Sequence, residues 1–149
     1  MRNIYLDIDG VLLLDDLENI GKGALRLSLF LSHLGNLQAD GKCKLYWLTT
    51  HCRDGSDKQV MSYLKPKLDP YDYDLIVRMK IQPTVWNELK TEAIDFSQDF
   101  LWFDDDASIK EREVLRAHNV EHKLIEIDLQ KDKYQLKTIV DSRLLEITA

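Results

Sequence analysis

The chain has 149 residues, of which 44% are hydrophobic and 31% are charged. This length suits one globular domain over residues 1–149, because a chain of this size can bury about 70% of its unfolded surface, and it excludes a disulfide-stapled miniprotein and a disordered tail. The 20 basic and 26 acidic residues give a net charge of −6 at pH 7 and form no long block of one sign, which argues against a broad polyanion-binding surface.

The cysteines and the N-terminus give no sign of secretion or of a membrane span. Cys43 and Cys52 fit neither the CxxC spacing of a redox or zinc motif nor the dense spacing of a secreted disulfide framework. The apolar run over residues 4–14 is interrupted by Asp7 and Asp9, so it suits neither a signal-peptide core nor a transmembrane helix. We therefore expect a cytoplasmic protein with reduced thiols.

Hydrophobic patterning in the first half of the chain predicts alternating strands and helices. A strand over residues 3–8 ends at the turn signal Asp9-Gly10, and an amphipathic helix follows over residues 23–37. Residues 43–49 suit a second strand. Ser56 is placed to cap a helix that ends before Pro66, after which loop residues continue to position 73.

The second half continues the alternation. Residues 75–79 suit a third strand, and Pro83 suits the first turn of a helix that continues to position 94. Residues 100–103 are uninterruptedly apolar, which is typical of a strand buried on both faces of a parallel sheet. A helix over residues 108–118, a last strand over residues 123–127 and an amphipathic C-terminal helix complete the pattern. The sequence predicts an α/β fold: a three-layer Rossmann-like domain around a mostly parallel five-stranded sheet.

Unusual polar residues stand where the predicted strands end. Asp7 and Asp9 lie at the end of the first strand, and Thr49 and Thr50 at the end of the second, while the fourth runs into three consecutive aspartates at 104–106. Ligands of such sheets bind beyond the carboxyl ends of the strands. Because carboxylates repel one another in a partly dry crevice, a cation is the simplest way to neutralise them, and oxygen ligands without histidine or cysteine suit Mg²⁺.

The same residues have a chemical use. A carboxylate beside a metal ion can attack phosphorus and form an aspartyl-phosphate. A second acid two residues further on, as Asp9 follows Asp7, can protonate the leaving group and later deprotonate water.

Four motifs, in order over residues 7–106, resemble those of the haloacid dehalogenase (HAD) superfamily. The segment Asp7-Ile8-Asp9-Gly10-Val11 resembles the DxDG first motif, and Tyr46-Trp47-Leu48-Thr49 resembles the second, an apolar strand ending in Thr or Ser. Lys90 resembles the third-motif lysine, and Leu101-Trp102-Phe103-Asp104-Asp105 resembles the fourth motif, an apolar strand ending in two acids.

The resemblance implies a role for each matching residue. Asp7 would be the nucleophile and Asp9 the general acid and base, while Thr49 and Lys90 would hold the phosphoryl group. Mg²⁺ would be bound by Asp7, Asp9 and Asp105, with Asp104 as a further candidate.

Several assignments stay open. Lys80 competes with Lys90 for the third motif, although Lys90 stands 14 residues before Asp104 on a helix expected to lead into the fourth strand. Thr50 competes with Thr49 for the phosphoryl-binding hydroxyl. His51 and Arg53 follow the second strand and are candidates for substrate contact, Arg53 as a bidentate phosphate donor. The family often has a further acid three to five residues after the fourth motif, whereas here Asp106 follows at once.

The resemblance also bears on the reaction and the substrate. Phosphatases of the superfamily keep an acid at the position of Asp9, so we expect Mg²⁺-dependent phosphomonoester hydrolysis. The intervals between motifs leave no room for a cap domain, and capless members tend to act on large phosphorylated substrates such as protein segments or nucleic-acid ends. The Trp-Leu-Thr-Thr and Trp-Phe-Asp-Asp-Asp segments also resemble HAD domains of nucleic-acid repair proteins, although the net charge of −6 lends no support to nucleic-acid binding.

Two other function classes remain as alternatives. A phospho-receiver signalling domain also combines an acidic pair, a phosphorylated Asp, a Thr and a Lys on a parallel α/β sheet, but its acceptor Asp follows the third strand, and the strand expected at 75–79 leads into no Asp. A non-catalytic module that keeps only metal or phosphate binding is the other alternative.

Overall fold

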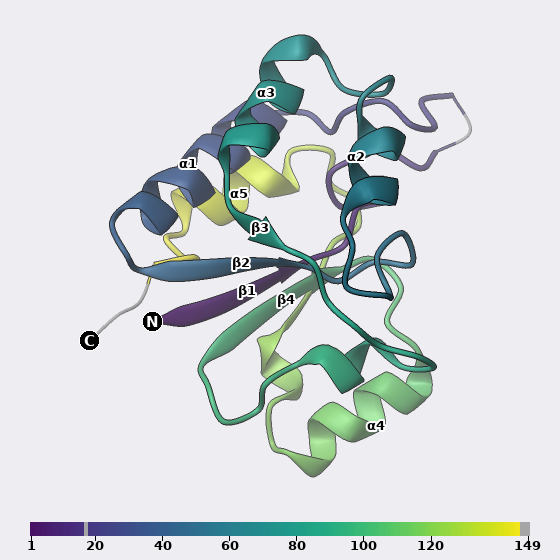
Figure 1. The fold of residues 1–149 in the computed structure, drawn as a ribbon, viewed down its shortest axis with the longest axis vertical. Helices are drawn as coiled ribbons and strands as arrows, with labels where there is room; N and C mark the ends of the chain where they lie inside the picture. The colour runs from purple at the N-terminus through teal and green to yellow at the C-terminus, as the bar shows by residue number, and fades with distance from the viewer. Residues whose placement is uncertain (17, 147–149) are drawn as a thin grey trace.

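A computed structural model describes residues 1–16 and 18–146 of the chain. Five strands form one parallel sheet in the order β3-β2-β1-β4-β5 (Figure 1). The strands are β1 (Arg2–Leu6), β2 (Cys43–Trp47), β3 (Ile81–Gln82), β4 (Phe100–Asp104) and β5 (Leu124–Glu126). Leu6 at the end of β1 is level with Trp47 of β2 and Phe103 of β4, so these three central strands end side by side.

Helices cover both faces of this sheet. They are α1 (Leu27–Ala39), α2 (Lys58–Leu64), α3 (Pro70–Arg78), α4 (Ile109–Ala117) and α5 (Gln135–Asp141), together with the 3₁₀ turns η1 (Lys90–Ala93) and η2 (Glu121–Lys123). Helices α1, α3 and α5 lie together on one side of the sheet and α4 on the other (Figure 1). Over the part of the chain that the structure describes, the predicted three-layer α/β architecture without a cap is thereby confirmed.

Two apolar clusters hold the layers together. Ile4 and Leu6 of β1 pack with Phe30 of α1 in one cluster, whereas Tyr5, between them in sequence, packs with Leu115 of α4 in the other. Successive side chains of a strand point to opposite faces, so a strand segment covered on both sides is apolar at consecutive positions, as residues 4–6 of β1 and 100–103 of β4 are. This explains why β1 and β4 could be recognised as short apolar runs.

The strand predicted over residues 75–79 is wrong, because this segment belongs to α3. Asp69 caps the helix by accepting a hydrogen bond from the backbone N–H of Asp72 at 2.9 Å, and Pro70 occupies the first helical turn, where its missing N–H costs nothing. The expected loop up to position 73 is therefore also helical from Pro70 onward. The true third strand, Ile81–Gln82, is a two-residue edge strand, too short to show a hydrophobic pattern.

The helix predicted over residues 83–94 is also wrong, since only η1 forms there. The carboxylate of Glu92 accepts hydrogen bonds from the backbone N–H groups of Asn87, Glu88 and Leu89, at 2.8–3.0 Å. The Trp86 indole N–H donates to the carbonyl of Cys52 at 2.9 Å. These contacts satisfy the polar groups of an irregular segment, so no helix is needed to pair them.

Other boundaries differ by a few residues. Strand β2 ends at Trp47, which leaves Thr49 in the following loop, and α1 begins at Leu27 rather than at position 23. Asp57, not Ser56, is the N-cap of α2, although the Ser56 hydroxyl accepts a hydrogen bond from the Lys58 N–H at 3.3 Å. Both cysteines are buried free thiols. Within residues 1–16 and 18–146, no helix has the length and apolar character needed to cross a membrane.

Candidate active site

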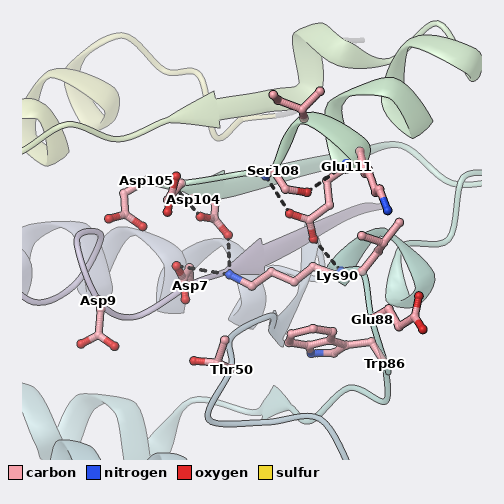
Figure 2. A pocket seen from close by; sticks show the side chains of 14 residues that line it. Asp7, Asp9, Thr50, Trp86, Glu88, Lys90, Asp104, Asp105, Ser108 and Glu111 are labelled. Carbon is pink, nitrogen blue, oxygen red and sulfur yellow. Dashed lines mark hydrogen bonds and ion pairs between the residues drawn. The ribbon is translucent and has the colours of Figure 1, made fainter.

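Three aspartates meet at the carboxyl end of the sheet. Asp7 directly follows β1, Asp104 is the last residue of β4, and Asp105 comes next. Because β1 and β4 are neighbours with Leu6 level with Phe103, the three carboxylates come together, with one oxygen of each within 4.8 Å of the others. Asp7 is 7% exposed and Asp104 only 1%. They line an open pocket of about 600 Å³, enough room for a small phosphomonoester (Figure 2).

Lys90 reaches into this acidic group from η1. Its Nζ lies 2.7 Å from Oδ2 of Asp104 and 3.4 Å from Oδ2 of Asp7 (Figure 2). Burial opposes the charged form, but the neighbouring carboxylates of Asp7 and Asp104 outweigh it and raise the pKa of Lys90, so the ammonium keeps its charge. Lys80, the competing lysine, immediately precedes β3, so it lies at the amino end of that strand, whereas the pocket is at the carboxyl ends. Its backbone is hydrogen-bonded to the Gln38 side chain. The structure thus brings Lys90, not Lys80, to the pocket.

One lysine does not balance three carboxylates. Burial, with the charge of Asp104 adding to it, raises the pKa of Asp7 well above its usual range. Burial and Asp104 likewise raise the pKa of Asp105 to about 6. A further positive charge at this point would stabilise both ionised carboxylates and lower the pKa values of Asp7 and Asp105. Three carboxylate oxygens, with no histidine or cysteine among them, fit Mg²⁺, which commonly takes a few protein carboxylates and keeps several waters.

Gly10 allows the loop after β1 to pass against Asp105. Its φ of +77° is in the left-handed region, and a Cβ at this position would lie 2.1 Å from Oδ2 of Asp105. The turn is closed by the Ile8 carbonyl, which accepts hydrogen bonds from the N–H groups of Val11 and Leu12. Glycine is therefore required both by the backbone conformation and by the contact with Asp105.

Asp9 lines the same pocket, but its carboxylate has other partners. The Tyr63 hydroxyl donates to Oδ1 of Asp9 at 2.5 Å, and Nε2 of His51 lies 2.9 Å from Oδ2. Figure 2 shows the Asp9 side chain directed away from Asp7 and Asp105. Of the expected metal ligands, Asp7, Asp104 and Asp105 come together, whereas the carboxylate of Asp9 is not part of their group.

The two candidate threonines differ in access. Thr49 is fully buried, and its Oγ1 accepts a hydrogen bond from the His51 N–H at 3.3 Å. Thr50 is exposed and lines the pocket (Figure 2). Thr50 is therefore the more accessible hydroxyl for a substrate, and Thr49 shapes the loop that carries it.

Arg53 supports the pocket wall and does not line the pocket. Its guanidinium lies 4.3 Å from the centroid of the Trp86 ring and donates to the Asn87 carbonyl. Trp86 itself faces the pocket (Figure 2). A direct phosphate contact from Arg53 would require these interactions to break.

The sequence patterns did not point to Glu111 or Tyr63 as site residues. Glu111 is buried and accepts hydrogen bonds from the backbone N–H groups of Lys90, at 2.6 Å, and of Ser108, at 2.9 Å. The spacing of Ser108 and Glu111 is that of a helix capping box, which is a signal for the helix start but not for the bond to Lys90. Tyr63 lies 54 residues from Asp9 and has no sequence signal for this contact.

Comparisons of the chain with protein-family models, with curated proteins and with solved structures give no match. A functional assignment therefore depends on the site itself.

Proposed function

We propose that the protein is a Mg²⁺-dependent phosphomonoester hydrolase of HAD type that acts through an aspartyl-phosphate on Asp7. The observation that carries the proposal is the position of the buried Asp7 carboxylate, at the base of an open pocket and within 3.4 Å of the Lys90 ammonium. A backbone hydrogen bond from Asp7 N–H to the Phe103 carbonyl, at 3.0 Å, fixes this residue to the end of the sheet. A fixed nucleophile of this kind reacts without first having to be ordered.

The reaction proceeds in two displacements. A carboxylate oxygen of Asp7 attacks phosphorus while the bond to the leaving oxygen breaks, and Asp9 gives its proton to that oxygen. In the second displacement, Asp9 takes a proton from water as the water attacks phosphorus, which releases inorganic phosphate and restores Asp7. Splitting one difficult step into two, with an acid and base at hand, is the usual advantage of covalent catalysis.

The other residues neutralise charge. Lys90 faces both Asp7 and Asp104, so it offsets the charge of the nucleophile and that of the phosphoryl oxygens. Asp7, Asp104 and Asp105 would hold Mg²⁺, which supplies further charge neutralisation when bound. Thr50 supplies an exposed hydroxyl for a phosphoryl oxygen. Because the pocket is open to solvent, the rest of a larger substrate, such as a phosphopeptide or an oligonucleotide end, can extend outside it.

A phospho-receiver function has less support. The third strand, Ile81–Gln82, runs into Pro83-Thr84, so no acceptor aspartate follows it. Lys90 precedes β4, whereas a receiver has its lysine near the fifth strand.

Phosphate release from a panel of substrates tests the proposal. The panel contains para-nitrophenyl phosphate, phosphopeptides and oligonucleotides with a 3′- or 5′-phosphate, each with Mg²⁺ and with a chelator. We expect release that requires Mg²⁺, that Asp7→Asn abolishes, and that Asp141→Asn on the distant, exposed part of α5 retains. Mg²⁺ binding without release from any substrate would contradict the proposal and favour a non-catalytic module, and a phosphoryl group retained for minutes would favour a receiver.

A further inference from the structure

The carboxylate of Asp9 is held in place although its side chain is 48% exposed. Both oxygens are engaged, Oδ1 by the Tyr63 hydroxyl at 2.5 Å and Oδ2 by Nε2 of His51 at 2.9 Å. A half-exposed aspartate ordinarily keeps its rotamer freedom and is hydrated, and fixing it costs conformational entropy. His51 from the loop after β2 and Tyr63 from helix α2 therefore both fix the same carboxylate.

The two partners of Asp9 are themselves fixed. The rings of His51 and Tyr63 stack with centroids 3.9 Å apart and planes 21° from parallel. The Lys67 ammonium lies 4.0 Å from the Tyr63 centroid, and since His51 occupies one face of that ring, Lys67 covers the other. The backbone N–H of His51 donates to Oγ1 of the fully buried Thr49, which ties the histidine to the end of β2.

We propose that Tyr63 and His51 are positioning residues that hold the carboxyl group of Asp9 for proton transfer to the leaving group. This inference rests on the proposed phosphatase function and deepens it, because it assigns the loop after β2 and helix α2 to the leaving-group side of the pocket. Asp7 and Asp9 border the same pocket, so a substrate whose phosphoryl group reaches Asp7 lies in the pocket that Asp9 also lines.

Asp9 loses a proton in the first displacement and regains one in the second. In the first displacement the proton of Asp9 passes to the bridging oxygen as its bond to phosphorus breaks, which leaves Asp9 as a carboxylate. In the second displacement the attacking water returns a proton to Asp9. The Tyr63 hydroxyl donates to Oδ1 throughout, so it restricts rotation of the carboxyl group without taking part in the transfer.

The inference predicts an effect that depends on the leaving group. Benzyl phosphate and para-nitrophenyl phosphate are similar in size, but the benzyl alkoxide needs a proton to depart, whereas para-nitrophenolate departs as an anion. With Mg²⁺ present, we expect Tyr63→Phe to lower kcat/KM on benzyl phosphate by about 10- to 100-fold, a part of the 10²–10⁴ that a general acid supplies. This ratio covers only the steps up to the departure of the leaving group, so the second displacement, in which Asp9 takes a proton from water, does not enter it. On para-nitrophenyl phosphate the change in kcat/KM should stay within about threefold, because para-nitrophenolate departs without a proton.

Matched variants separate positioning from a general loss of structure. Tyr71→Phe removes a hydroxyl from a tyrosine on α3 that is 63% exposed, and it should leave both rates unchanged. His51→Gln tests the second partner by the same comparison, should Tyr63→Phe fail to fold. In the Asp9→Asn background, Tyr63→Phe should cause no further loss on benzyl phosphate, since the group that it positions is already gone.

The outcomes distinguish this inference from the proposed function. An equal loss of kcat/KM on both substrates, or no loss on either, would overturn the positioning role while leaving the phosphatase intact. A further loss from Tyr63→Phe in the Asp9→Asn background would also overturn it. Wild-type protein that releases phosphate with Mg²⁺ neither from benzyl phosphate nor from any substrate of the panel would overturn the proposed function, and the positioning role with it.

Discussion

The ammonium nitrogen of Lys90 lies 2.7 Å from Oδ2 of Asp104, and the two side chains are only 12% and 1% exposed. The carboxylate of Asp104 also accepts a hydrogen bond from the backbone N–H of Asp106 at 2.8 Å. Both charged groups are buried and have lost their hydration, and the attraction between them compensates for that loss. If one group is removed, the other charge stays buried without this compensation.

Removal of the lysine should therefore destabilise the fold itself. Lys90→Met leaves Asp104 and Asp7 without a cation, and we expect the free energy of unfolding of the metal-free protein at neutral pH to fall by about 3–5 kcal/mol. Lys80→Met, at an exposed position, should change it by less than about 0.5 kcal/mol. Urea denaturation measures both. Equal stability of Lys90→Met and wild type would show that the buried pair contributes nothing.

Gly10 and Gly41 form a matched pair of substitutions. Both have positive φ, +77° and +71°, but a Cβ on Gly41 meets nothing within 4 Å, whereas one on Gly10 meets Asp105 at 2.1 Å. Gly41→Ala should lower the free energy of unfolding by only about 1–2 kcal/mol, the penalty for a left-handed backbone conformation. Gly10→Ala should cost more and should also displace Asp105 from Asp7.

Thermal unfolding with and without Mg²⁺ separates the two effects. Mg²⁺ should raise the Tm of wild type and of Gly41→Ala, because a ligand that binds only the folded state stabilises it. The increase should be lost in Gly10→Ala. If Gly10→Ala kept the full increase, Asp105 would not be a ligand.

Glu111 joins α4 to the turn that carries Lys90. Its carboxylate accepts one hydrogen bond from each of the Lys90 and Ser108 N–H groups. Glu111→Gln places an amide NH₂ against one of these donors, so we expect a loss of about 1–3 kcal/mol in the free energy of unfolding and a lower kcat. Glu113→Gln, at an exposed position of the same helix, should change neither. Unchanged stability and kcat in Glu111→Gln would contradict this role.

Asp72 gives a pH dependence that is separate from the pocket. Burial raises its pKa to about 6, with the charge of Asp69 contributing, and its Oδ1 is buried without a hydrogen-bond partner among the described residues. A carboxyl group whose pKa is higher in the folded state contributes stability at low pH, and this contribution is lost as the pH rises through 6. Asp72→Asn has no such loss. Its stability relative to wild type should therefore rise by about 1 kcal/mol between pH 4.5 and 7.5, a value reduced for solvent screening. A difference in Tm that stays constant over this range would contradict the assignment.

The sequence predicts those parts of the fold and of the site that depend on neighbouring residues, and it misses those that depend on contacts between distant segments. Strands β1 and β4 could be predicted because both of their faces are buried, and parallel topology then places Asp7 and Asp104 at one edge. The two-residue edge strand β3 has no pattern of its own, and η1 follows from bonds that Glu92 makes to the backbone. The contacts of Tyr63 with Asp9 and of Glu111 with Lys90 join segments that no motif connects. Such contacts are set by the packed fold, so they emerge only in three dimensions.

The central claim is that Asp7 carries the phosphoryl group, and rapid acid quench during turnover tests it most directly. Protein mixed with Mg²⁺ and para-nitrophenyl phosphate is quenched within the first turnovers, and its peptides are analysed by mass spectrometry. We predict a phosphoryl group on the peptide that contains Asp7, absent from Asp7→Asn and absent when a chelator replaces Mg²⁺. Phosphate release by Asp7→Asn at the wild-type rate, with no labelled Asp7 peptide from wild type, would contradict the account.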